Sequence, residues 1–197
     1  LNTIDNPIFP NSGKRLSASF EYAGVGGNTN FYKPRGEVIW YFRTTEKQSV
    51  GLRFAGEYIV PFGGTVEIPI FERLFMGGEY SIRGFDLRSV GPMDESTGLV
   101  LGGNKSFLFN GEYIFTIAPP VRLILFFDTG QVQARGDRFS KTDFKTSTGA
   151  EVRFMMPVMN VPLRLIFAYN PQRSGVLDNS FRPESAFNFR FAVGSSF

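Results

Sequence analysis

Lys-Ser-Phe-Leu-Phe-Asn-Gly-Glu-Tyr-Ile-Phe-Thr, at residues 105–116, alternates between two kinds of side chain. In an extended chain, one face carries Phe107, Phe109, Tyr113 and Phe115, and the opposite face carries Ser106, Asn110 and Glu112. A period of two residues is typical of a β-strand with two different environments on its two faces. This stretch therefore predicts a strand with one aromatic face and one polar face.

The same alternation recurs along the chain on both sides of this stretch. It predicts further strands at 14–23, 32–42, 49–58, 121–128, 147–156, 163–170 and 187–197. Most of these segments carry charge on the polar face and large aliphatic or aromatic residues on the other. The sequence therefore predicts an all-β fold of eight strands.

The connections between these segments alternate in length. Long connections cover 24–30, 60–103, 135–145 and 171–185, and short ones cover 44–48, 117–120 and 157–162. An outer-membrane barrel has long loops on one side and short turns on the other, whereas a soluble β-sandwich has no reason to alternate in this way. We therefore expect a transmembrane antiparallel β-barrel whose aromatic face meets lipid.

Composition narrows the classes of function. The chain of 197 residues has no cysteine and no histidine, so thiolate metal sites and histidine-based catalysis are excluded, and we expect no metal and no cofactor. The net charge of +3 is too small and too scattered to indicate nucleic acid. The first five residues are polar and show no signal peptide, so an exported form would be mature or truncated.

The connection at 60–103 is the longest, and its centre is rich in glycine and charge. Residues 76–92 read Met-Gly-Gly-Glu-Tyr-Ser-Ile-Arg-Gly-Phe-Asp-Leu-Arg-Ser-Val-Gly-Pro. Long loops without regular structure are usually functional. Arg83 offers five fixed donors suited to carboxylates, and Glu112 and Asp128 lie on the polar faces of the two strands that follow. From the residues alone, these acids are either docking partners of Arg83 or ordinary charges of the barrel interior.

The motif Ile82-Arg83-Gly84-Phe85 resembles the Val-Arg-Gly-Phe loop of BamA-type outer-membrane barrel assembly factors. The resemblance extends over the chain, through a turn at 5–10 and the Gly-Gly-Asn at 102–104. It implies that residues 1–197 are the C-terminal half of a sixteen-stranded barrel with an inward-folding loop at about 60–103. It also implies that Arg83 docks on Glu112 and Asp128.

The last predicted strand ends in an aromatic residue, Phe197. Such an ending resembles the C-terminal sorting signal of bacterial outer-membrane proteins. By the same resemblance, Gly194 and Phe197 belong to the edge that forms a lateral gate. A closed eight-stranded barrel holds only side chains. The chain is therefore part of a larger barrel, or two such halves combine, or the long loop lies outside, and the sequence leaves these alternatives open.

The resemblance implies a non-enzymatic function in the bacterial outer membrane, namely the assembly and insertion of other barrels. The implied partners are outer-membrane lipids, nascent outer-membrane proteins and accessory lipoproteins. A polypeptide secretion pore of the two-partner type shares the loop motif and is the alternative. A small barrel enzyme is disfavoured because those enzymes typically use histidine, and a plain adhesion barrel would not explain the motif.

Overall fold

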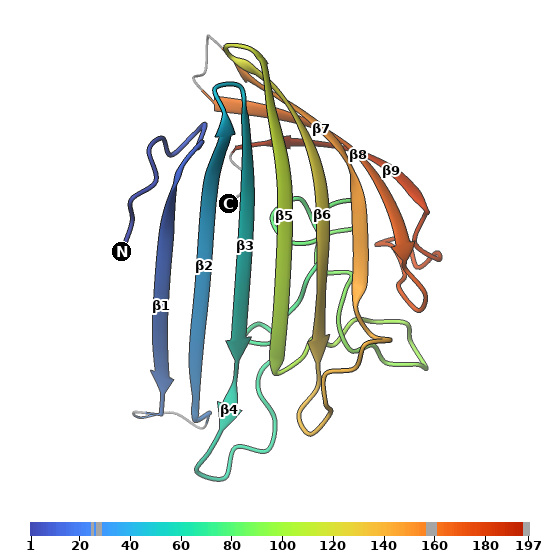
Figure 1. Cartoon of the computed structure of the whole chain (residues 1–197). Helices are drawn as coiled ribbons and strands as arrows, with labels where there is room; N and C mark the ends of the chain where they lie inside the picture. The colour runs from blue at the N-terminus through green and yellow to red at the C-terminus, as the bar shows by residue number, and fades with distance from the viewer. Residues whose placement is uncertain (25, 27–28, 157–160, 195–197) are drawn as a thin grey trace.

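The computed structural model describes residues 1–24, 26, 29–156 and 161–194, and it shows a curved antiparallel β-sheet (Figure 1). Its strands are β1 (Gly13–Ala23), β2 (Phe31–Thr45), β3 (Gln48–Tyr58), β4 (Val60–Pro61), β5 (Lys105–Ala118), β6 (Val121–Gln133), β7 (Lys145–Met156), β8 (Val161–Gln172) and β9 (Phe187–Val193). The strand order is β1-β2-β3-β5-β6-β7-β8-β9, with β4 beside β2. The order ends at β1 and β9, so the sheet is open in the part of the chain that the structure describes.

The eight long strands expected from the alternation are confirmed, with differences at their ends. The two-residue strand β4 carries no sequence signal. Strand β6 continues past Asp128 to Gln133. The sequence does not predict this extension, because residues 130–133 are buried on both faces and so lose the alternation that marks a strand. Strand β9 ends at Val193, so Gly194 lies outside the strand, and residues 195–197 of the predicted strand lie beyond the described residues.

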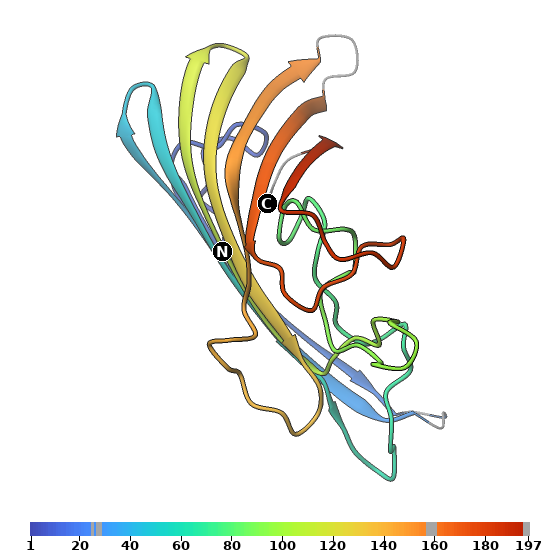
Figure 2. The same ribbon diagram turned by 90° about the vertical axis from the view of Figure 1, so that its right-hand side faces the viewer.

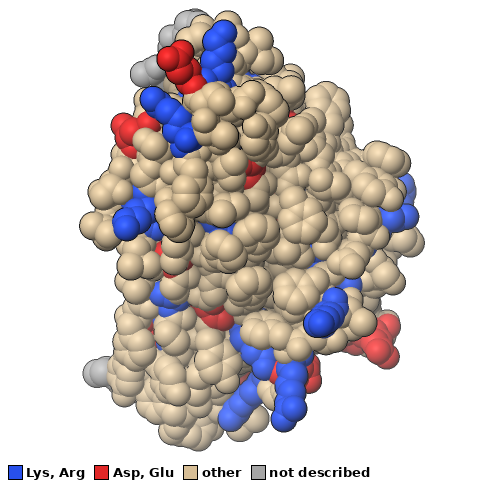
Figure 3. All heavy atoms as spheres, in the orientation of Figure 1, with Lys and Arg blue, Asp and Glu red and all other residues tan. Residues whose placement is uncertain are grey.

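The aromatic faces of the strands point outward, away from the long loop. Exposed outward-facing side chains include Leu16, Phe20, Tyr22, Val38, Trp40, Phe54, Tyr58, Leu125, Phe127, Phe167, Tyr169, Phe187, Phe189 and Phe191. Figure 3 views this outer face, and most of it is uncharged surface. An apolar patch of this extent is far larger than soluble monomers expose, and it fits a lipid environment.

The polar faces point inward and are buried. Buried inward-facing side chains include Glu37, Arg53, Asn110, Glu112, Arg122, Asp128, Glu151, Arg153, Arg164 and Asn170. Charged side chains are rarely buried to this degree unless they are paired. The sheet therefore has the reverse of the usual soluble pattern, with its charges inside and its aromatic rings outside.

The connection between β4 and β5, residues 62–104, is called the long loop here, and it lies against the middle and lower part of the inward face (Figure 2). Met76 and Val90 bond to each other through both backbone groups at 2.9 Å, which holds the loop in a compact shape. An apolar cluster lies between the loop and the sheet, formed by Phe31, Ile59, Ile68, Leu74, Met76, Ile82, Phe85, Val90, Leu108, Val132 and Val176. Among the described residues, no helix has the length and apolar character to cross a membrane.

Candidate functional site

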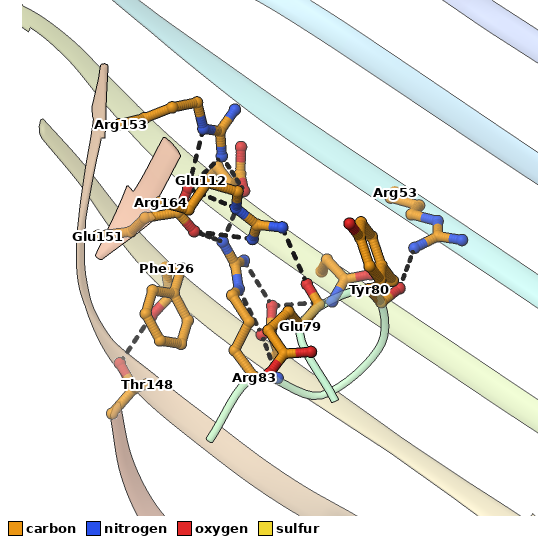
Figure 4. Close-up of polar contacts among 12 residues, drawn as sticks. Arg53, Glu79, Tyr80, Arg83, Glu112, Phe126, Thr148, Glu151, Arg153 and Arg164 are labelled. Carbon is orange, nitrogen blue, oxygen red and sulfur yellow. Dashed lines mark hydrogen bonds and ion pairs between the residues drawn. The ribbon is translucent and has the colours of Figure 1, made fainter. Parts of the chain in front are cut away.

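Arg83, in the long loop, lies against the inward face of the sheet and is 2% exposed (Figure 4). Its Nε and Nη2 atoms donate to the two carboxylate oxygens of Asp128, both at 2.7 Å. Its Nη1 atom donates to Glu112 at 2.7 Å and to Glu151 at 3.1 Å. The guanidinium carbon also lies 4.0 Å from the ring centroid of Phe126. The forked contact of Arg83 with Asp128 uses the planar geometry of arginine, which a lysine does not reproduce.

Two further arginines complete an arginine–carboxylate network. Arg164 on β8 donates to both oxygens of Glu151 at 2.9 Å. Arg153 on β7 donates to Glu151 at 2.8 Å and reaches Glu112 at 3.5 Å. Arg153 and Arg164 face each other across β7 and β8, a repulsive pairing that the shared Glu151 offsets.

The network is electrically balanced. It contains Arg83, Arg153 and Arg164 against Glu112, Asp128 and Glu151, and each of the six side chains is at most 2% exposed. Buried charges of this kind are tolerated only when each is paired and hydrogen-bonded. Removing one member therefore leaves an uncompensated charge in the interior.

Residues 79–84 form the loop tip, and inward-facing side chains hold its backbone. The carbonyl of Glu79 accepts from Arg164 at 3.2 Å, and the carbonyl of Tyr80 accepts from Arg53 at 2.8 Å. The remaining contacts are Ser81 O with Asn110 at 2.7 Å, Arg83 N with Asp128 at 3.0 Å and Gly84 O with Asn170 at 3.2 Å. Side chains from β3, β5, β6 and β8 thus fix the loop tip through its main chain.

The residues beside Arg83 pack closely against the sheet. Ile82 and Phe85 are 0% and 1% exposed within the apolar cluster. Gly84 has a φ of +88°, and a Cβ there would lie 2.5 Å from the Cβ of Ala168 and 2.7 Å from Asn170 Oδ1. Glycine at position 84 therefore meets both a conformational and a steric requirement.

The long loop also contacts β9. The hydroxyl of Tyr80 donates to the carbonyl of Val193 at 2.6 Å, and an added Cβ on Gly194 would lie 3.1 Å from this hydroxyl. Asp86 forms an ion pair with Arg190 on β9 and accepts from the backbone of Asn179 at 2.7 Å. The structure thus places Gly194 beside the loop tip, while Phe197 lies outside the described residues.

Arg83 and Glu184, which both lie outside the strands, have shifted pKa values. Burial alone would lower the pKa of Arg83, but the charges of Asp128 and Glu112 outweigh it and raise that pKa well above the usual value. Burial raises the pKa of Glu184, in the connection between β8 and β9, and the neighbouring charge of Asp86 acts in the same direction. Arg83 is therefore a fixed cation, whereas Glu184 resists ionisation.

The family resemblance implied that Arg83 docks on Glu112 and Asp128, and the structure places a carboxylate oxygen of each 2.7 Å from a guanidinium nitrogen. Sequence reasoning missed Glu151, and it also missed Arg153 and Arg164. These three residues occupy polar-face positions on the next two strands, so the alternation along each strand indicates that they point inward. The alternation alone does not tell which inward charges reach the loop.

The whole chain, residues 1–197, matches the family described as the Omp85 superfamily domain. Two curated relatives are named "Outer membrane protein assembly factor BamA". The one from Nitratidesulfovibrio vulgaris is 29% identical and the one from Neisseria meningitidis 26%, each over all of this chain. The chain spans only 24% and 28% of these two relatives.

A third relative, which matches a shorter part of the chain, is named "Sorting and assembly machinery component 50 homolog" in Homo sapiens. It is 31% identical over 60% of this chain, and the match spans 25% of that protein. The crystal structure of BamA from Haemophilus ducreyi lacking POTRA domains 1-3 superposes on 98% of this chain and 40% of its own, with a TM-score of 0.79 and 21% identity. That likeness shows the fold of an outer-membrane barrel. The family match over all 197 residues shows that this chain belongs to the Omp85 superfamily.

Proposed function

We propose that this chain is the C-terminal barrel segment of an outer-membrane protein assembly and insertion factor. The observation that carries the proposal is the match of all 197 residues to the Omp85 family, together with the names of its two bacterial relatives. The outward aromatic face and the buried charges are consistent with a position in the outer membrane. The segment acts without covalent chemistry.

In this proposal, the motif Ile82-Arg83-Gly84-Phe85 fixes the long loop against the inward face. Arg83 is the anchor, and Glu112 and Asp128 are its acceptors, at contact distances of 2.7 Å. Gly84 allows the loop tip to approach β8 closely, and Phe85 fills the apolar cluster. A fixed loop keeps the barrel interior in one conformation while the edge strands of the barrel change their pairing partners.

The partners in this proposal are nascent outer-membrane proteins, outer-membrane lipids and accessory lipoproteins. An unpaired strand edge provides a template to which another strand can add. Strand β9 stands at the end of the strand order, and Gly194 and Phe197 follow it in sequence. We assign these residues to the edge that receives a client strand, where local thinning of the bilayer lowers the barrier to insertion.

The test is replacement of Arg83 by alanine or Asp128 by arginine in the full-length parent protein, followed by measurement of outer-membrane protein levels. We expect both variants to lower these levels, because each leaves buried charge uncompensated. The control is Arg135→Ala, which removes an exposed arginine from the connection between β6 and β7. Wild-type levels of clients in both variants, with the parent protein present at normal amount, would contradict the anchoring role.

A polypeptide secretion pore of the two-partner type is the second candidate. The observation that favours it is the inward face itself, whose charged side chains would line a passage that the long loop obstructs. Depletion of the parent protein separates the two candidates. Loss of many different outer-membrane proteins supports the assembly factor, whereas loss of one secreted partner alone supports the pore.

A further inference from the structure

A row of small side chains crosses the outward face near the end of the sheet that carries the long connections. Ala18 pairs with Gly36 across β1 and β2, and Gly36 pairs with Gly56 across β2 and β3. The row is roughly 10 Å long, because neighbouring strands lie about 4.8 Å apart. The flanking rows hold larger side chains, with Leu16, Val38, Phe54 and Phe109 on one side and Phe20, Pro34, Tyr58 and Lys105 on the other.

A cavity of about 610 Å³ lies over this row, and we call it the outer groove. Gly36 and Gly56 form its floor, and the rings of Tyr58, Phe107 and Phe139 stand along its sides. Because these residues belong to the outward faces of β2, β3 and β5 and to the connection after β6, the groove opens toward the surroundings of the barrel. Its lining is mainly apolar.

Neither floor glycine is required by the local structure. A Cβ at Gly36 would meet no atom within 4 Å, and one at Gly56 would meet only the carbonyl of Ser106, at 3.8 Å. Both residues have an ordinary extended backbone, which any amino acid adopts. By contrast, a Cβ at Gly149 would lie 2.0 Å from the carbonyl of Phe167, so that glycine is required by packing. Glycine weakens a strand interior and often marks close approach of a ligand.

One end of the outer groove is positively charged. Lys105 begins β5, its Nζ lies 5.6 Å from the centroid of Phe139, and it donates to the carbonyl of Asp137. Arg138, between Asp137 and Phe139 in the sequence, is exposed. Figure 3 shows Lys and Arg side chains at the lower end of the outer face, with Asp and Glu side chains among them, below a broad uncharged surface. Two other lining residues, Arg35 and Glu57, occupy inward-facing positions of β2 and β3 and lie opposite each other across these strands.

We propose that the outer groove binds an acyl chain of an anionic, phosphate-bearing membrane lipid. The acyl chain lies over Gly36 and Gly56 between the aromatic walls, and the phosphate contacts Lys105. The combination of an apolar floor with a cation at one end matches a lipid lying along the strands, with its headgroup toward the long connections. In outer-membrane barrels these connections lie outside the cell, which assigns the lipid to the outer leaflet.

A lipid fits the outer groove better than a peptide strand. Strands β2 and β3 are hydrogen-bonded to neighbours on both sides, and so is β5, so the groove offers no free backbone edge for a strand to join. A peptide placed there would leave its own amide groups without partners in an apolar surrounding, whereas an acyl chain has none to satisfy. Lipid is also the medium that surrounds this face.

The test is native mass spectrometry of the full-length parent protein in detergent, titrated with phosphatidylglycerol or with phosphatidylcholine of the same acyl chains. The double variant Gly36→Leu/Gly56→Leu fills the groove and should weaken phosphatidylglycerol binding about tenfold, the factor that corresponds to about 1.4 kcal/mol. Ile117→Phe is the control, because it adds apolar volume to an exposed position at the other end of β5.

Two further variants keep the test decisive if the double variant fails to fold. Gly56→Ala should raise thermal stability, since the backbone there suits alanine, and should also weaken lipid binding. Lys105→Gln should abolish the preference for phosphatidylglycerol over phosphatidylcholine, whereas Lys141→Gln, on the exposed connection after β6, should not. Wild-type binding in the glycine variants, or an unchanged headgroup preference in Lys105→Gln, would overturn the proposal.

This inference requires the outward face to meet lipid, but it does not require the assembly role. Groove variants that lose lipid binding while outer-membrane protein levels stay normal would support the lipid site and leave the proposed function intact. Conversely, the parent protein could bind lipid as expected while its depletion leaves the levels of all outer-membrane proteins unchanged. That pair of results would contradict the proposed function and leave the lipid site intact.

Discussion

The hydroxyl of Tyr80 donates a hydrogen bond of 2.6 Å to the carbonyl of Val193, which joins the loop tip to the end of β9. The two residues lie 113 positions apart in sequence. Arg83, three residues further along the loop, is fixed by carboxylates on β5, β6 and β7. The loop tip therefore connects the middle of the sheet to its C-terminal edge, so a displacement of the loop would change how that edge is held.

Tyr80→Phe should loosen the end of β9 without unfolding the sheet. The substitution keeps the ring and removes one hydrogen bond, whose net contribution is about 1 kcal/mol. We expect faster amide hydrogen exchange in residues 190–194 of the full-length protein, measured by mass spectrometry. Tyr113→Phe is the matched control, because it removes a tyrosine hydrogen bond to Gln48 on β3 and does not involve β9. Unchanged exchange in Tyr80→Phe would show that this hydrogen bond does not hold the edge.

Arg83→Met should destabilise the protein strongly, because it leaves three buried carboxylates with too little positive charge. Breaking a buried ion pair from one side costs about 3–5 kcal/mol. The double variant Arg83→Met/Asp128→Asn should recover part of this loss, because Arg153 and Arg164 are then balanced by Glu112 and Glu151, with which they form ion pairs. Unfolding by urea in lipid vesicles measures the difference. A double variant less stable than Arg83→Met would contradict the charge-balance account.

Gly84→Ala should displace the loop tip, because the new Cβ would overlap with Ala168 at 2.5 Å and with Asn170 at 2.7 Å. Overpacking typically costs about 1–3 kcal/mol, and the positive φ adds a separate cost. Gly175→Ala separates the two effects, because Gly175 has a φ of +73° and open space around its Cβ position. We expect a clearly larger loss of unfolding free energy for Gly84→Ala, and equal losses would mean that steric overlap contributes nothing.

Glu184→Gln should change how stability depends on pH. Burial raises the pKa of Glu184 above the ordinary value of 4.5, so the folded state holds this proton more tightly than the unfolded chain does. The resulting stabilisation is full below the ordinary value and is lost as pH rises through the raised value. The glutamine variant should therefore gain in unfolding free energy relative to wild type as pH rises through this window. Glu46→Gln, at an exposed turn, is the control and should show no such trend.

The sequence by itself determined the strands and the orientation of their faces. The alternation at 105–116 and in the seven similar segments is local, and each strand needs only its own residues to express it. Parity placed Glu112 and Asp128 on the inward side, and the motif at 82–85 indicated which part of the long connection they would meet. These features depend on spacing of a few residues, which a sequence displays directly.

Only the tertiary structure decided which inward charges meet the loop. Glu151 contacts Arg83 from 68 positions away, and Arg164 reaches the carbonyl of Glu79 from 85 positions away. Parity gives every inward side chain the same status, whereas contact depends on the curvature of the sheet and the path of the loop across it. The openness of the sheet and the outer groove over Gly36 and Gly56 also follow from the register between strands, since no single strand encodes which residue lies opposite another.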